Sequence, residues 1–405
     1  MAKSPARGCK LMTSIKNHKK EDLYKPYFPD DWEDKILHDL AEWKNGLAFR
    51  DISFSDNGMP VIKITELKNG ITNQTKFTNQ IFDNTVFLTK NDMVFSWSGN
   101  PETSIDVFWY NLPDGWLNQH IFKITTKQEI DENFFFYILK YLKPNFTKIA
   151  SNKQTTGLGH VTINDLKQIC IKIPPLPTQR AIAATLSCLD DKIEMNSRIN
   201  HYLEQMAQGI YDQFFGLGKQ VGRLSDICRY SDKKIAVATL SPQTYISTEN
   251  MLLNKAGYTE TTSLPQFART TKFDSGDVLV SNIRPYFKKI VYCNFTGGCS
   301  TDVLCFLAAN SDLSAFLYCT LYRDQFFDHM LAGSKGTKMP RGDKRQIMNY
   351  PVVIPDKKTL LRFSNSVNPI LIHKCHLSAE NRVLAAIRDT LLPKLMSGKI
   401  KAEER

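Results

Sequence analysis

The densest group of basic residues in the chain lies near its C-terminal end. The segment 335–345 contains one acidic residue, Asp343, and five basic residues: Lys335, Lys338, Arg341, Lys344 and Arg345. Glycines and small polar residues alternate with them, so backbone and basic side chains can approach phosphates and the edges of bases. The pattern indicates a nucleic-acid contact; a solvated surface turn is the alternative.

An earlier segment, 151–157, is rich in amide and hydroxyl side chains. Such groups suit base edges, where Arg favours guanine and Asn or Gln favours adenine. Residue type and expected loop position select candidate contacts to DNA, some of them to phosphate rather than to bases. They are Arg50, Asn100, Lys153, Gln154 and Thr155 in the first half and Arg284, Tyr286, Lys288, Ser334, Lys335, Thr337, Lys338 and Arg341 in the second.

Residue patterns that carry catalysis are missing from the sequence. It contains no phosphate-binding G-x-x-x-x-G-K-[ST], no H-E-x-x-H, no G-x-S-x-G and no [Asp/Asn]-Pro-Pro-aromatic tetrapeptide. Asp190 and Lys192 fall on a helical stretch, where such a pair arises by chance. Cys293, Cys299 and Cys305 lie six apart, which fits no common metal site. We therefore expect no catalytic residue, no metal and no enzymatic activity in this chain.

The elements that position these loops occur twice. Ile173-Pro174-Pro175-Leu176-Pro177 and Val353-Ile354-Pro355-Asp356 each precede a long helical stretch, at a constant offset that aligns Ile173 with Ile354. Upstream of each stretch, Asn91-Asp92-Met93-Val94 resembles Gly276-Asp277-Val278-Leu279. The chain is thus an internal repeat of two similar halves.

The two helical stretches share a heptad spacing of apolar residues, which predicts that they pack on each other as a coiled coil. Asn200 and Asn381 are polar at aligned positions and are expected to fix the register, while Pro369 and Pro393 predict a kink or a break. Two ordinary core helices are the alternative. The predicted seam consists of Ile182, Leu186, Leu189, Ile193, Asn200, Leu203, Phe363, Val367, Ile370, Asn381, Leu384 and Leu391.

Short β-branched and aromatic runs, separated by Gly, Asn, Asp and Pro, fill both halves and predict twisted antiparallel sheets with a few helices. The expected fold is α+β: two similar globular domains joined by two long antiparallel coiled-coil helices, with an internal pseudo-twofold repeat. The expected boundaries are a basic tail at 1–20, a first domain at 21–176, a central helix at 177–217, a second domain at 218–355 and a C-terminal helix at 356–400.

Composition excludes several classes of protein. A hydrophobic content of 42% in 405 residues argues against general disorder. No apolar run is long enough for a membrane span, and we expect a cytoplasmic protein without a secretory signal. The net charge of +11 comes largely from the tail, so overall charge alone is weak evidence for nucleic acid.

Two segments carry a resemblance to a known family. Ile173 to Ile182 is similar to the first turns of the central helix, and Leu391 to Ile400 to the closing segment, of type I restriction-modification specificity (S) subunits, the HsdS family. The resemblance implies two target-recognition domains that each read part of a split site in double-stranded DNA. It also implies two methyltransferase subunits on the helices, with restriction subunits joined through them. S-adenosylmethionine, ATP and Mg²⁺ would be bound by those partners, and no cofactor by this chain.

Three alternatives remain open at this point: a fused nuclease or methylase, a scaffold that binds no DNA, and a solitary specificity homologue without active partners.

Overall fold

The computed structural model describes residues 26–49, 52–72, 74–154, 157–216, 222–336 and 338–403. The chain divides into two compact units. Unit 1 comprises Met1–Asp191 and Ala385–Arg405, and unit 2 comprises Lys192–Leu384. Both unit boundaries fall inside long helices, α5 (Leu176–Phe215) and α9 (Lys357–Met396), so each helix contributes to both units.

Unit 1 is built on a four-stranded antiparallel sheet of order β2-β10-β6-β8. Its strands are β2 (Ala41–Asn45), β10 (Ile121–Thr126), β6 (Met93–Ser96) and β8 (Asp106–Trp109). Helices α2 (Glu132–Tyr141) and α3 (Lys143–Asn152) bury Phe134, Phe135 and Phe146 in the same core as strand residues Phe95 and Phe122. Aromatic side chains therefore supply much of the apolar area that holds helices to sheet.

A second sheet and several short elements complete unit 1. The second sheet contains β4 (Phe77–Thr78), β3 (Met59–Ile62), β9 (Gly115–Leu117) and β5 (Phe87–Leu88), with β3 and β9 parallel. The two-stranded pairs are β1 (Glu33–Ile36) with β12 (Cys170–Ile173) and β7 (Ser98–Gly99) with β11 (Gly159–His160). The remaining helical turns are η1 (Leu37–Leu40), α1 (Ile64–Asn69), η2 (Asn84–Val86) and α4 (Ile163–Leu166).

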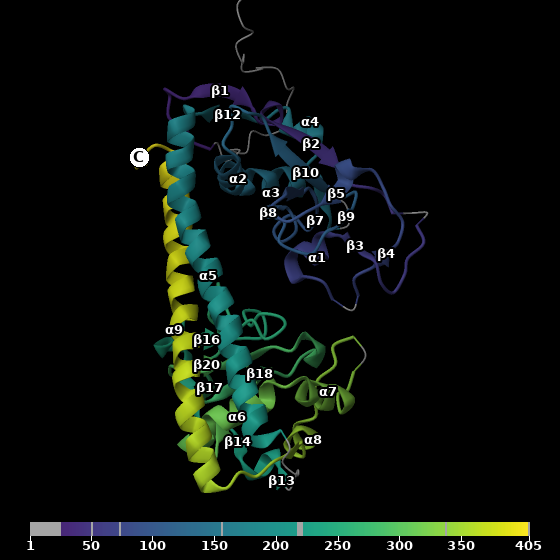
Figure 1. Ribbon diagram of the computed structural model, residues 1–405. Coiled ribbons are helices and arrows are strands. Elements are labelled where there is room, and N and C mark those ends of the chain that lie inside the picture. The colour runs from purple at the N-terminus through teal and green to yellow at the C-terminus, as the bar shows by residue number, and fades with distance from the viewer. Residues whose placement is uncertain are drawn as a thin grey trace, which may run out of the picture. The chain divides into compact units, whose positions relative to one another are not determined.

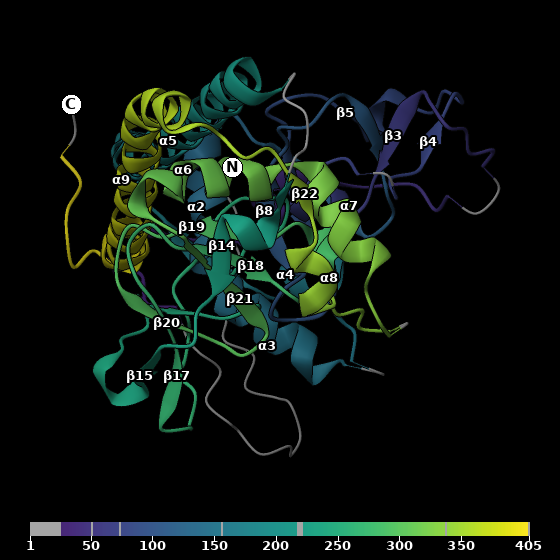
Figure 2. The same cartoon turned by 90° about the horizontal axis from the view of Figure 1, so that it is seen from below.

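Unit 2 repeats this plan (Figures 1 and 2). Its antiparallel sheet contains β14 (Cys228–Tyr230), β21 (Val303–Ala308), β18 (Val278–Ser281) and β19 (Ile290–Tyr292). The second sheet contains β15 (Lys234–Ala236), β17 (Arg269–Phe273), β20 (Gly297–Cys299) and β16 (Tyr245–Ile246), with β16 and β20 parallel. One short pair joins β13 (Gly222–Arg223) to β22 (Pro351–Val352). The helices are η3 (Leu224–Asp226), η4 (Val237–Thr239), η5 (Pro285–Phe287), η6 (Ser311–Leu313), α6 (Ser314–Tyr322), α7 (Asp324–Ala332) and α8 (Lys344–Met348).

The repeat extends to individual hydrogen bonds before the central strand of each sheet. Asn91 and Gly276 both have positive φ, 71° and 93°, a conformation that Asn and Gly adopt most readily. The next residue is aspartate in both units. Asp92 Oδ2 accepts from the backbone N–H of Thr89 at 2.7 Å, and Asp277 Oδ2 accepts from that of Asp274 at 2.7 Å. The matching motifs in the sequence therefore encode the same turn twice.

The long helices α5 and α9 pack together through apolar residues in each unit (Figure 1). In unit 1, Leu186 of α5 and Leu395 of α9 belong to one core. In unit 2, Phe215 of α5 and Phe363 of α9 belong to another. The predicted seam residues Ile182, Leu186, Phe363 and Val367 are fully buried, and the others are half-buried.

Two details of the helices differ from the expectation. The helix α9 runs without a break over Pro369 and Pro393, and Val367 and Leu371 on either side of Pro369 are buried in the core. The aligned asparagines have separate partners. Asn381 accepts from Asn196 Nδ2 at 2.9 Å, whereas Asn200 donates to Ser378 at 3.0 Å. Within the described segments, no helix is long and apolar enough to cross a membrane.

The glycine at position 209 provides a test of the helix. Gly209 lies in α5, and a methyl group added there meets no atom within 4 Å. Gly209→Ala should therefore raise the free energy of unfolding by about 1 kcal/mol, because alanine favours the helix more than glycine does. Urea denaturation measures the change.

A glycine in the second sheet of unit 2 serves as the contrast. A methyl group on Gly297 would collide with the backbone carbonyl of Thr244, so Gly297→Ala should lower the free energy of unfolding. Equal shifts of the urea midpoint for the two substitutions would contradict these placements.

Candidate nucleic-acid interface

Two sequence-distant segments of candidate residues meet in unit 2. The central strand β18 ends at Ser281 and continues into residues 282–288, here called the strand-end loop. Residues 333–342, here called the basic loop, follow α7. The backbone N–H of Arg284 donates to Pro340 O at 2.8 Å, and that of Gly342 donates to Asn282 O at 3.2 Å. Arg284, Tyr286 and Lys288 therefore lie in a loop bonded to the loop that carries Ser334, Lys335, Lys338 and Arg341.

The described residues of the basic loop are bonded at its base. Lys335 and Arg341 exchange two backbone hydrogen bonds, at 2.9 and 3.0 Å. Gly342 permits the close approach to the strand-end loop, since a Cβ there would lie 2.9 Å from Asn282 Oδ1 and from Ile347 Cδ1. These bonds fix the backbone from which the basic side chains project.

Strained backbone is concentrated beside these loops. Asn254, Lys255, Arg284 and Lys288 have positive φ between 49° and 64° although none is glycine. Their segments are joined, because the N–H of Asn254 donates to Phe287 O at 2.9 Å and that of Lys255 to Lys288 O at 2.8 Å. Unfavourable conformations of this kind persist where surrounding contacts impose them, which occurs often at functional sites.

Several polar atoms near the strand-end loop are buried without a hydrogen-bond partner among the described residues. They are Asn282 Oδ1, Arg284 Nε, Ser300 Oγ and Gln346 Oε1. A buried polar atom without a partner carries a desolvation cost of about 1–3 kcal/mol. Arg284 is also held 5.8 Å from the ring of Phe287. Its guanidinium is thus positioned in part and has unused donor capacity.

Most of the other candidate cations in unit 2 already have a carboxylate. Lys335 pairs with Asp343 at 3.1 Å, Arg341 with Asp302 at 3.2 Å and Lys288 with Asp324 at 3.1 Å. Lys255 also bonds Asp324, and these two lysine contacts lower the pKa of that carboxyl group despite an opposing effect of burial. Lys338 is exposed and has no ion pair among the described residues, and Tyr286 is 46% exposed.

Unit 1 brings the equivalent segments together. After the central strand β6, the strand β7 pairs with β11, which follows α3, and Val161 N–H donates to Trp97 O at 2.8 Å. Asn100 Oδ1 accepts from the backbone of Glu102 and Thr103, so this amide oxygen is occupied by its own turn. Lys153 pairs with Asp165 at 2.5 Å, and Gln154 is exposed at the end of α3.

A cluster of lysines in unit 1 was not predicted. Lys140 and Lys143 bind the two oxygens of Asp106 at 2.9 and 2.6 Å. Lys68 donates to the carbonyl oxygen of Thr103, beside them. Burial lowers the pKa of the Lys68 ammonium group, and repulsion from Lys143 lowers it further. Two of the three cations share one carboxylate and the third has none, so the cluster has an excess of positive charge that suits a phosphate group.

Nothing in the sequence marks this cluster, because Lys68, Asp106, Lys140 and Lys143 come from α1, β8, α2 and α3 respectively. Of the residues predicted to contact DNA, Arg50, Thr155 and Thr337 lie outside the described residues.

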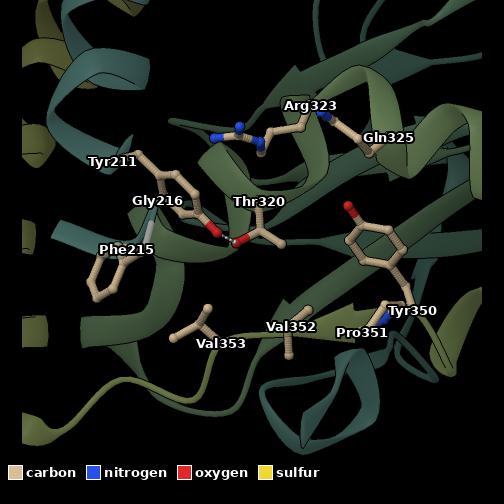
Figure 3. A pocket seen from close by; sticks show the side chains of 10 residues that line it. All are labelled: Tyr211, Phe215, Gly216, Thr320, Arg323, Gln325, Tyr350, Pro351, Val352 and Val353. Atoms are coloured by element: carbon tan, nitrogen blue, oxygen red, sulfur yellow. Dashed lines mark hydrogen bonds between the residues drawn. The ribbon is translucent and has the colours of Figure 1, made fainter. Parts of the chain in front are cut away.

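A cavity of about 180 Å³ lies in unit 2, between the C-terminal end of α5, α6 and β22 (Figure 3). Two of its polar groups bond each other, Tyr211 OH and Thr320 Oγ1 at 3.0 Å, and Arg323 pairs with Asp212, which does not line the cavity. The described residues contain no group of three His, Cys, Asp or Glu side chains that could hold a metal ion. Burial raises the pKa of the Cys293 and Cys319 thiols, so they are unreactive.

Comparisons with known proteins agree on one family. The profile of the Type I restriction modification DNA specificity domain matches residues 29–205. The MjaIX specificity subunit of Methanocaldococcus jannaschii is 23% identical over 326 residues, which cover 71% of this chain and 73% of that one. The EcoBI specificity subunit of Escherichia coli is 26% identical over 182 residues, 44% of this chain and 36% of that one.

The MjaVIII specificity subunit of Methanocaldococcus jannaschii is 26% identical over 212 residues, 51% of this chain; the match spans about half, 47%, of that subunit. Among solved structures, the S subunit of a type I restriction-modification system from M. genitalium has the same fold. Its TM-score is 0.52 at 18% identity, and the match covers 90% of this chain and 96% of that one. In sequence and in fold, the chain is therefore similar to the specificity subunits of type I restriction-modification systems.

Proposed function

We propose that the chain is the sequence-specific DNA-binding subunit of a type I restriction-modification complex, in which each unit reads one part of a bipartite site. The observation that carries this proposal is the repeated junction of loops. In both units the segment after the central strand is bonded to the segment after a helix, β7 to β11 after α3 in unit 1 and Ile283 to Arg341 after α7 in unit 2. Two copies of one junction suit two half-sites.

The charges near the junctions suit different parts of DNA. Lys68 and Lys143 in unit 1, and Lys338 in unit 2, are suited to phosphates, whose contacts carry affinity but little sequence information. Arg284 is suited to guanine, because its guanidinium has unused donors and a restricted position. Tyr286 offers a partly exposed ring and hydroxyl in the same loop.

We further propose that the long helices set the separation of the two half-sites and carry the partner subunits. A helix of 40 residues is about 60 Å long, whereas one turn of DNA is about 34–36 Å. Large apolar side chains are exposed along both helices, notably Met195, Tyr202 and Met206 on α5 and Val383 and Ile387 on α9. Such residues suit contacts with other proteins.

Those partners would be two methyltransferase subunits, with restriction subunits joined through them. S-adenosylmethionine, ATP and Mg²⁺ would be bound by the partners, and this chain would hold no cofactor of its own.

Sequencing of methylated bases in a host tests the proposal. A host with this gene and its methyltransferase genes should acquire methylation at a split motif, because the chain supplies recognition and its partners supply the chemistry. A host with the methyltransferase genes alone, or with this gene alone, should not. Methylation by the purified chain without partners would contradict the non-catalytic role, and absence of a split motif with the full set would contradict DNA recognition.

The role of Arg284 can be separated from that of a phosphate contact. Arg284→Ala should relax the preference at one position of one half-site, by about 1–3 kcal/mol. Lys338→Ala should instead weaken binding of all sequences alike. Binding to a panel of single-base variants of the target measures both. A uniform loss for Arg284→Ala would show that this side chain contacts the backbone of DNA.

The lysine cluster of unit 1 should govern salt dependence. Lys68→Gln combined with Lys143→Gln should reduce the slope of log binding constant against log salt by about 2, because each lost phosphate contact lowers it by about 1. Lys394→Gln, an exposed lysine on α9, is the matched control and should leave the slope unchanged. An unaltered slope in the double variant would remove the cluster from the DNA interface.

A further inference from the structure

Polar residues occupy one heptad position of both long helices. Spaced one heptad apart, they are Asp190, Ser197 and Glu204 on α5 and Lys374, Asn381 and Arg388 on α9. In unit 1, Arg388 Nη1 bonds Asp190 Oδ1 at 2.6 Å. In unit 2, Asn381 Nδ2 donates to Ser197 Oγ at 3.1 Å, and Lys374 Nζ bonds Glu204 Oε2. The acids are all on α5 and the bases all on α9, and we call these six residues the polar ladder.

Each ion pair of the polar ladder also holds a tyrosine from the globular part of its own unit. Tyr137, on α2, donates to Asp190 Oδ2 at 2.7 Å. Tyr318, on α6, donates to Glu204 Oε2 at 2.7 Å and accepts from Lys374 Nζ at 2.9 Å. The two tyrosines are at aligned positions of the repeat. The same connection between a helix of the globular part, α2 or α6, and the long helices is therefore made twice.

Glu204 and the two tyrosines are buried, whereas Asp190, Arg388 and Lys374 are half-buried. Glu204 is 5% exposed and Tyr318 3% exposed. Burial raises the pKa of both the Tyr137 and the Tyr318 phenol, so each hydroxyl stays protonated and donates. A buried ion pair adds little net stability compared with apolar residues, but a buried charge that loses its partner is costly. A pair of this kind therefore selects one arrangement more than it strengthens that arrangement.

The polar ladder discriminates against a slip of one heptad. In one direction, Glu204 would move from Lys374 to face Val367, and Arg388 would face Ala183. In the other direction, Asp190 would face Leu395, and Lys374 would face Tyr211. Either slip leaves an acid and a base against apolar or aromatic neighbours. Pairing of α5 with a second α5 would bring acid against acid, and a pair of α9 helices would bring base against base.

We propose that Asp190, Glu204, Lys374, Arg388 and the two tyrosines are positioning residues that fix the register of α5 against α9 and the seat of each recognition domain on them. The spacing between the two half-sites then depends on these residues although they contact no base. This inference rests on the function proposed above. It assigns to these ion pairs the preference for one distance between the half-sites, which the loops alone do not determine.

The test uses the complete chain assembled with its methyltransferase subunits. Its activity is measured on DNA substrates that differ in the distance between the two half-sites. Tyr318→Phe removes one hydroxyl and keeps the ring. Its preference for the wild-type spacer over spacers one base pair longer or shorter should fall at least tenfold. Tyr110→Phe is the matched control, because the Tyr110 hydroxyl is bonded to Pro113 O and lies in the second core of unit 1. It should keep the wild-type preference.

Exchanging the two charges distinguishes loss of the ion pair from general misfolding of a variant. Glu204→Lys and Lys374→Glu should each abolish spacer preference or assembly, because each places like charges together beside Tyr318. The double variant should regain the wild-type spacer preference. The inference is overturned if Tyr318→Phe keeps the wild-type preference, or if the double variant recovers no more than the single ones.

Failure of the proposed function gives a different result. In that case the wild-type complex methylates no split site at all, and thermal unfolding decides the register. A midpoint lowered by each single exchange and restored in the double variant supports the ion-pair register, and additive losses reject it.

Discussion

The mutual burial of two long helices is the constraint on which the rest of the structure depends. Neither helix has a core of its own. The apolar ends of α5 and α9 are buried by both the other helix and a sheet domain, as Leu186 and Leu395 are in unit 1 and Phe215 and Phe363 in unit 2. Helical stability comes mostly from such packing rather than from intrinsic propensity. Each domain therefore buries apolar residues of the helix pair, and the helix pair buries apolar residues of each domain.

The two units of the repeat share the same backbone hydrogen bonds around their central strands. Asp92 and Asp277 form the same turn before the central strand, and each strand then runs into a loop bonded to the segment after α3 in unit 1 or after α7 in unit 2. Backbone hydrogen bonds maintain this frame without regard to most side chains, so the loops can change residues while the frame is kept. Unit 1 has amides and a lysine cluster at this place, and unit 2 has the basic loop.

The sequence predicted what depends on local order and period. Strands such as Val278–Ser281, the two long helices and the aligned Asn91 and Gly276 turns follow from residue patterns over a few positions. It did not predict the cluster around Asp106, because three separate helices bring Lys68, Lys140 and Lys143 to it. The ion partners of Lys374 and Arg388 could not be identified either, since a charged residue on a long helix has no evident role in the sequence until Glu204 and Asp190 face it. The continuity of α9 over its prolines, with Val367 and Leu371 buried on either side of Pro369, was not predicted either.

The distribution of polar groups suggests how one chain can combine a fixed frame with variable recognition. Strain and unpaired polar atoms are concentrated near Arg284, where a ligand can supply the missing partners. Between the long helices the charged groups Glu204 and Asp190 are paired with bases instead, although the amide oxygens of Asn196 and Asn200 there have no partner among the described residues. A loop with unpaired donors can bind different bases after small changes, whereas a change at an ion pair must be compensated by its partner. Under the proposed function, the loops would determine which bases are read, and the helices would restrict where they are read.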